Sequence, residues 1–146
     1  MHFVVNMTNE KITRLLIEQN PFWKAPSPIG YKDRSVYPSI KRLLKEQQII
    51  SLCGLRRVGK TTIMKKLMEE LLKENTPDSM LYFSFDDFAQ TELFPVLDAF
   101  MELHGKEPKF LFFDEIQKVP NWAEKVKLLY DSGKYKIIVS GSESLF

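Results

Sequence analysis

The feature that most constrains this sequence is the stretch GLRRVGKTT, which runs from Gly54 to Thr62. Two glycines stand five positions apart and are followed by Lys60 and Thr61, which matches the phosphate-binding pattern Gly-x4-Gly-Lys-Ser/Thr in full. Glycines let successive backbone N–H groups converge on phosphate oxygens, and a helix that starts at the lysine adds its positive N-terminal end. The other interpretation of the stretch is a solvated basic turn.

The segments on either side of the loop favour the phosphate-binding interpretation. Residues 49–53 form a short, mostly apolar run that predicts a buried strand, and residues 60–73 carry an apolar stripe at helical spacing. The loop therefore lies between a strand and a helix, as a phosphate-binding loop must. We expect Lys60 to reach the β and γ phosphates of a nucleotide and the Thr61 hydroxyl to bind Mg²⁺.

The rest of the chain alternates between predicted helices and strands. Further helices are expected at residues 12–19, 36–46, 91–103 and from 121 onward, and further strands at 80–85, 110–113 and 136–139. Asn121 and Glu124 match a capping box at the start of the last helix. Residues 21–33 predict an irregular strap, in which Phe22 and Trp23 anchor the chain. Such alternation predicts an α/β domain with a parallel sheet covered on both faces.

Composition excludes several classes of protein. The formal net charge of +2 does not by itself predict nucleic-acid or membrane binding. The single cysteine, Cys53, excludes an intramolecular disulfide framework, and we expect it to be a buried small hydrophobe. His2 and His104 are far apart and do not predict a metal site. No apolar run reaches the ~20 residues that span a bilayer, and a signal peptide is not recognisable, so we expect a soluble cytoplasmic protein.

A second motif, FLFFDEIQ at residues 110–117, complements the loop. An apolar strand that ends in an acid places a carboxylate where it holds a Mg²⁺-bound water beside the phosphates, and Asp114 fits that place. Glu115 fits the base that polarises an attacking water. The alternative is that both acids only begin a solvated loop. Alone the motif does not decide between them, but its combination with the loop favours the metal and base roles.

The stretches GLRRVGKTT, LYFSFDD, FLFFDEIQKVPNW and IIVSGSESL resemble the AAA-type P-loop ATPase domain of the prokaryotic and archaeal ATPase group. Members of that group often carry a nuclease-like domain further along the chain. The resemblance divides the chain into an N-terminal helix and strap (1–33) and an ATPase core (34–146). It implies a P-loop NTPase three-layer sandwich with the strand order 5-1-4-3-2, and ATP and Mg²⁺ as cofactors.

The resemblance also implies roles for individual residues. Asp114 would be the Walker B acid that holds Mg²⁺ together with Thr61, and Glu115 would be the catalytic base that acts with Lys60. The implied nucleotide-binding residues are Gly54, Arg57, Val58, Gly59, Lys60, Thr61, Thr62 and Arg34.

The resemblance places two further groups near the nucleotide. The strand at 136–139 should end in a polar sensor beside the γ-phosphate, with Ser140 as first choice and Ser142 as second. The segment YKDRSVYPSI resembles one that borders the adenine, so Tyr31 and Arg34 are expected there.

Two pairs of charged residues have weaker assignments. Arg56 and Arg57 are predicted to project from the loop. They contact the nucleotide or a neighbouring subunit, or they are simply solvated, and the sequence favours neither interpretation. Asp86 and Asp87 end the second strand, where we favour a solvated turn over support for the metal.

The chain ends at Phe146, just past the fourth predicted strand, whereas the resemblance implies a fifth strand, a helical lid and an arginine that acts on a neighbour's ATP. We therefore expect an incomplete fold that hydrolyses ATP weakly. Its first strand, 49–53, would be an open edge, which residues 2–5 cover or through which the chain self-associates.

Three classes of function stay open. The leading one is the ATP-binding core of an AAA-type ATPase that hydrolyses ATP with Mg²⁺ to drive a conformational change in a larger protein. A non-hydrolysing nucleotide-binding or partner-binding module is the second. A small-molecule kinase is the third, and Glu115 favours water over a substrate hydroxyl as nucleophile. A GTPase is disfavoured because the sequence has no Asn-Lys-x-Asp motif. The client, nucleic acid or protein, is not specified by the sequence.

Overall fold

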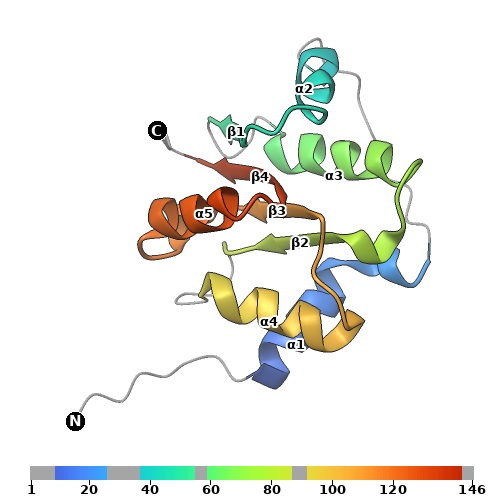
Figure 1. The fold of residues 1–146 in the computed structure, drawn as a ribbon, viewed down its shortest axis with the longest axis vertical. Coiled ribbons are helices and arrows are strands. Elements are labelled where there is room, and N and C mark those ends of the chain that lie inside the picture. Colours follow the sequence, from blue (N-terminus) through green and yellow to red (C-terminus); the bar gives the residue numbers. More distant parts are fainter. Residues whose placement is uncertain (1–8, 26–36, 55–58, 87–91, 143–146) are drawn as a thin grey trace.

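The computed structural model describes residues 9–25, 37–54, 59–86 and 92–142 (Figure 1). Its helices are α1 (Asn9–Gln19), α2 (Tyr37–Leu43), α3 (Lys60–Leu71), α4 (Leu93–His104) and α5 (Trp122–Asp131), with short 3₁₀ helices η1 (Pro21–Trp23), η2 (Pro77–Ser79) and η3 (Ile116–Lys118). Its strands are β1 (Ile50–Cys53), β2 (Met80–Ser84), β3 (Phe110–Asp114) and β4 (Lys136–Gly141). Each helix and strand predicted from the sequence is present, and the bounds differ by a few residues at most.

The four strands form one parallel sheet in the order β1-β4-β3-β2. This order is the one that the resemblance implied for the first four strands, so that prediction is confirmed. Parallel pairing brings the carboxyl ends of the strands to one edge of the sheet, where Ser84 lies opposite Asp114 and Cys53 lies opposite Gly141. Polar residues that follow the strands are thereby gathered along that edge.

Helices cover both faces of the sheet, which gives the predicted three-layer sandwich (Figure 1). Because successive strand residues point to opposite faces, Phe112 packs in the core under α3, whereas Phe113 packs in the core under α1, α4 and α5. Both rings are completely buried, and a fully buried phenylalanine contributes about 1.5–3 kcal/mol of hydrophobic stabilisation. These apolar layers hold the strand ends in fixed positions.

The outer edge of β2 is paired by side chains of the last residue of α1 and of the residue that follows it. The side-chain amide of Asn20 donates to the carbonyl oxygen of Tyr82 (2.8 Å) and accepts from the Tyr82 N–H (2.9 Å). Two residues further along β2, the N–H of Ser84 donates to the side-chain oxygen of Gln19 (2.7 Å). These two amides take the place of a neighbouring strand, so the backbone groups of β2 that face away from β3 are satisfied.

The predicted anchors of the strap pack against opposite sides of the core. Phe22 packs against the cluster under α3, and Trp23 packs against the cluster under α4. The indole N–H of Trp23 donates to the carbonyl oxygen of Met80 (2.9 Å), which extends the side-chain pairing along β2. At the other end of the sheet, β1 is the outermost strand within the described ranges, and self-association through its edge stays a prediction.

Two local predictions are wrong. Cys53 is exposed, because it lies at the end of an outer strand and alternates with Leu52, whose side chain points into the core. Asn121 does not form the predicted capping box with Glu124. Its backbone is left-handed (φ 55°, ψ 35°) and its side chain makes no capping hydrogen bond, whereas a side-chain cap requires an extended backbone at that residue.

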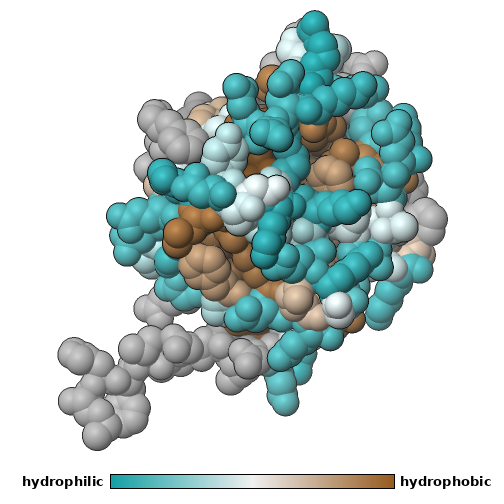
Figure 2. All heavy atoms as spheres, in the orientation of Figure 1, coloured by the Kyte–Doolittle hydropathy of each residue, from teal (hydrophilic) through white to brown (hydrophobic). Residues whose placement is uncertain are grey.

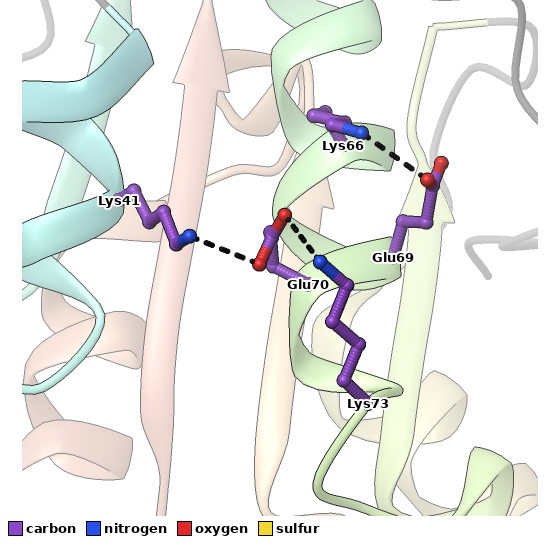
Figure 3. Close-up of polar contacts among 5 residues, drawn as sticks. All are labelled: Lys41, Lys66, Glu69, Glu70 and Lys73. Atoms are coloured by element: carbon purple, nitrogen blue, oxygen red, sulfur yellow. Dashed lines mark hydrogen bonds and ion pairs between the residues drawn. The ribbon is translucent and has the colours of Figure 1, made fainter.

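Helix α2 is joined to α3 by an ion pair between Lys41 and Glu70 (3.2 Å), and Lys73 approaches the same carboxylate at 3.0 Å (Figure 3). Burial alone would raise the pKa of Glu70, but hydrogen bonds from Lys73 and Lys41 lower it below its ordinary value. Lys66 and Glu69 form a further pair on α3. Such pairs at the surface contribute at most about 1 kcal/mol each, so packing rather than charge holds α2 in place.

Hydrophilic side chains occupy most of the face drawn in Figure 2, and hydrophobic ones form separate groups among them. Within the described ranges, every helix is too short or too polar to traverse a bilayer.

The pairing of the β2 edge can be tested by stability measurements. Asn20 is 1% exposed, and replacing it with alanine leaves the N–H and carbonyl of Tyr82 without their partner. We expect Asn20→Ala to lower the free energy of unfolding by about 2–3 kcal/mol in urea denaturation. Asn75→Ala is the matched control, since the Asn75 amide only donates to the Leu71 carbonyl at the end of α3 and should cost below about 1 kcal/mol. Equal losses in the two variants would contradict the assignment.

Candidate functional site

The predicted loop leaves β1 and enters α3 through glycines with unusual backbone angles. Gly54 has φ 143° and Gly59 has φ 82°, both in the region where a side chain is strained. Gly59 is the N-terminal cap of α3 and, having no side chain, makes no side-chain capping bond. Backbone amides at a helix start are suited to bind an anion.

Lys60, the first residue of α3, is a buried cation. The residue is 4% exposed, and its Nζ donates to the carbonyl oxygens of Gly54 and of Gly141 (2.7 Å). The lysine therefore bridges the carboxyl ends of β1 and β4. The two carbonyl dipoles accept from the ammonium but do not neutralise its charge, so an anionic ligand would be favoured beside it.

Asp114, at the end of β3, is a buried carboxylate that accepts hydrogen bonds from three hydroxyl groups. Thr61 Oγ1 and the Tyr82 hydroxyl both donate to Oδ2, at 2.6 and 2.7 Å, and Ser140 Oγ donates to Oδ1. The three donors come from α3, β2 and β4, and Asp114 is 3% exposed. The arrangement fixes the carboxylate beside the start of α3, where the sequence predicts the metal.

Glu115 follows with a left-handed backbone (φ 54°, ψ 48°), a conformation that costs a non-glycine residue of order 1 kcal/mol or more. Its N–H donates to Ser140 Oγ (3.1 Å). Its carboxylate, 7% exposed for the whole residue, accepts from Ser142 Oγ (2.8 Å) and from the side-chain amide of Gln117. Because of this turn, the carboxylates of Asp114 and Glu115 have different hydrogen-bond partners.

The two serines considered as sensors have different surroundings. Ser140 is completely buried and connects Asp114 with the backbone of Glu115. Ser142 lies against the Glu115 carboxylate and also accepts from Gln117 Nε2 (3.1 Å). Ser142, the second choice, is thus the serine in contact with the predicted base, and Ser140 supports the predicted metal acid.

Three side chains at the site were not singled out from the sequence. Tyr82 contacts Asp114, Gln117 contacts Glu115, and the Lys65 ammonium lies 3.5 Å from the centroid of the Tyr82 ring. Burial lowers the pKa of Lys65 to about 8, although the negative charge of Asp114 acts in the opposite direction. The only sequence signal for Tyr82 was its polar hydroxyl, two positions before the end of β2. Gln117 lies within the DEIQ motif at residues 114–117.

The donor set fits Mg²⁺. The hydroxyl of Thr61 and the carboxylate of Asp114 are oxygen ligands, which this cation prefers, and it is commonly held by one or two carboxylates together with substrate phosphates. In the described part of the chain, no group of three or more His, Cys, Asp and Glu side chains could hold a metal ion alone.

The remaining predicted residues have simpler outcomes. Thr62 is half-buried in the first turn of α3. Asp86 is half-buried just beyond β2, and its N–H donates to Ser84 Oγ (3.4 Å). The predictions for Tyr31, Arg34, Arg56, Arg57, Val58 and Asp87 lie outside the described residues.

A parallel α/β sandwich with the glycine loop after β1, Lys60 at the start of α3 and Asp114 at the end of β3 defines a P-loop NTPase domain. A family model described as an AAA domain matches residues 46–146. The chain belongs to this family.

The chain is similar to two proteins of Methanocaldococcus jannaschii. It is 34% identical to uncharacterized protein MJ1637 over 106 residues, which are 68% of this chain and 22% of that protein. It is also 34% identical to uncharacterized protein MJ1544 over 121 residues, 80% of this chain and 26% of that protein. The chain thus spans about a quarter of the length of these relatives. A solved structure of Pif1 helicase from Candida albicans is similar over 76% of this chain and 32% of that chain, with a TM-score of 0.47 and 12% identity.

The different surroundings of the two serines lead to a stability prediction. Ser140→Ala leaves the Glu115 N–H and one oxygen of Asp114 without partners in a buried place, so we expect a loss of about 2–3 kcal/mol in the free energy of unfolding. Ser142 is half-buried, and we expect Ser142→Ala to cost below about 1 kcal/mol. Urea denaturation of both variants measures the difference. A Ser142→Ala loss as large as that of Ser140→Ala would show that the two serines are structurally equivalent.

Proposed function

We propose that this chain binds ATP with Mg²⁺ at the carboxyl edge of its sheet and hydrolyses the ATP, as the nucleotide-binding core of an AAA-type ATPase. The observation that carries the proposal is the 2.6 Å hydrogen bond between Thr61 Oγ1 and Asp114 Oδ2. It joins the residue after the loop lysine to the acid that ends β3, which lie far apart in the sequence. A metal bound by the Thr61 oxygen would have the Asp114 carboxylate beside it.

Most of these residues would bind the nucleotide and the metal, and Glu115 would take part in hydrolysis. Backbone amides at the start of α3 would receive the phosphates, and Lys60 would exchange its carbonyl partners for phosphate oxygens, which form stronger charge-assisted hydrogen bonds. Thr61 and Asp114 would hold Mg²⁺, which neutralises charge on the phosphates when bound. The layers of the sandwich hold the backbone of Thr61 and Asp114 in place, so the two metal ligands would need little reorganisation on binding.

Glu115 is the residue proposed to accept a proton from the attacking water. Its carboxylate is held by Ser142 and Gln117, which orients it without neutralising its charge. A carboxylate fixed next to the metal acid is in the right part of the site for general-base catalysis. We propose that hydrolysis drives a conformational change in a larger protein. The relatives, about four times longer than the part that this chain matches, support only the larger protein.

The binding step can be tested with Lys60→Ala. Removing the ammonium eliminates charge-assisted hydrogen bonds to the phosphates, and we expect the Kd for ATP with Mg²⁺ to rise about tenfold or more. Isothermal titration calorimetry measures the change. Lys127→Ala is the control, since Lys127 is an exposed lysine on α5 that pairs with Asp131. Equal affinity of the wild type and Lys60→Ala would show that the loop does not bind phosphate.

The chemical step can be tested with Glu115→Gln, which keeps the shape of the side chain and removes its basicity. We expect ATP affinity to stay within about twofold and single-turnover hydrolysis to slow by about 10²-fold or more, the usual effect of losing a general base. If the wild type binds ATP but does not hydrolyse it, the chain is a non-hydrolysing binding module. If hydrolysis by Glu115→Gln is as fast as by the wild type, Glu115 is only a structural acid.

A further inference from the structure

Tyr82 connects the outer strand of the sheet to the predicted metal acid. Its side chain is 5% exposed and lies in the core under α3, with the hydroxyl 2.7 Å from Asp114 Oδ2. The same oxygen accepts from Thr61 Oγ1. Asp114 therefore receives one hydrogen bond from a residue that would itself bind the metal, and another from a residue of β2.

The position of Tyr82 is fixed from two directions. On the outer side of β2, both backbone groups of Tyr82 are hydrogen-bonded to the side-chain amide of Asn20, at 2.8 and 2.9 Å. On the α3 side, the Lys65 ammonium lies over the ring at 3.5 Å from its centroid, a favourable cation–π geometry. With backbone and ring both held, the hydroxyl is a donor in a defined place.

The hydrogen bond from the Tyr82 hydroxyl to Asp114 does not serve only to fill the core. A phenylalanine at position 82 would fill the same space, so the hydroxyl is not needed to complete the apolar core. A buried carboxylate gains from each donor because hydrogen bonds to the ionised form are strong. The donor also restricts rotation of the carboxylate plane, which determines where its oxygens point when a metal is present.

We propose that Tyr82 is a positioning residue for the metal site, which holds the Asp114 carboxylate in the orientation that receives Mg²⁺ with the nucleotide. The proposal rests on the proposed binding of ATP with Mg²⁺. Partners that hydrogen-bond to a metal ligand fix its orientation, and their removal commonly lowers metal affinity 10- to 100-fold. Tyr82 does not touch the nucleotide phosphates in this scheme and acts only through Asp114.

The test uses Tyr82→Phe, which keeps the ring and removes the hydroxyl. Nucleotide binding is measured by calorimetry in EDTA and across a Mg²⁺ titration at fixed ATP. We expect the affinity for metal-free ATP to stay within about twofold of the wild type, while the half-saturating Mg²⁺ concentration rises about tenfold. Tyr135→Phe is the matched control, because the Tyr135 hydroxyl also contacts a carboxylate, Glu107 (3.1 Å), at a distance from the site. It should leave both values unchanged.

The outcomes separate this proposal from the one on which it rests. If the wild type shows no Mg²⁺-dependent ATP binding, both proposals are wrong. If the wild type shows it and Tyr82→Phe has the same half-saturating Mg²⁺ concentration, only the role of Tyr82 is wrong. A Tyr82→Phe variant that loses thermal stability without a change in Mg²⁺ dependence has lost only a stabilising hydrogen bond, which also overturns the proposal.

A second measurement uses the wild-type protein, so it does not depend on whether a variant folds. In wild-type protein with ¹³C-labelled tyrosine rings, the Cζ resonance of Tyr82 reports on the hydrogen bond of its hydroxyl. We expect this resonance to shift on adding Mg²⁺ to the ATP-bound protein, because the charge on Asp114 is then shared with the metal. The Tyr135 resonance should stay in place. A Tyr82 resonance that does not respond to Mg²⁺ would contradict the proposal.

Discussion

A buried negative charge, the carboxylate of Asp114, is the constraint on which the site depends. Removing a carboxylate from water costs several kcal/mol unless hydrogen bonds replace the lost hydration. Here the replacement comes from three hydroxyl groups on α3, β2 and β4. Each donor reaches Asp114 only if the strands end at matching heights and α3 begins beside β3. The register of the sheet and the satisfaction of this charge therefore depend on each other, so a shift of either neighbouring strand would disrupt the site along with the core.

The N-terminal helix contributes to the same arrangement through the edge of the sheet. Helix α1 shares the apolar core with α4, since Leu16 and Phe100 are both completely buried in one cluster. Its C-terminal end presents Asn20 to the backbone of Tyr82, and Tyr82 in turn contacts Asp114. A continuous set of hydrogen bonds thus runs from α1 across β2 to the predicted metal acid. Side-chain amides that block the β2 edge also prevent that strand from pairing with another chain.

The sequence predicted the parts of this structure that depend on local patterns. Apolar runs located the strands, and the glycine spacing located the loop, because both are set by neighbouring residues. The order of the strands came from the resemblance, and the structure confirms it for β1 to β4. Contacts across the sheet were not predictable in the same way. Tyr82 and Asp114 meet because β2 pairs with β3, which no local pattern reveals. The predictions for Cys53 and Asn121 were wrong for reasons that the local sequence also does not show. Cys53 lies on an outer strand and is exposed, and Asn121 adopts a left-handed backbone.

The distribution of charge at the site is consistent with the proposed binding of a phosphate ligand together with a cation. Lys60 and Lys65 lie on α3, Asp114 ends β3 and Glu115 follows it, yet no ion pair joins the lysines to the acids within the described residues. Carbonyl oxygens hold Lys60, an aromatic ring lies beneath Lys65, and neutral donors hold the two acids. Had the lysines and acids paired with one another, a ligand would have to break those pairs before it bound. Neutral partners keep the charges separate at the cost of desolvation, and under the proposed function the lysine would be available to phosphate and Asp114 to a cation.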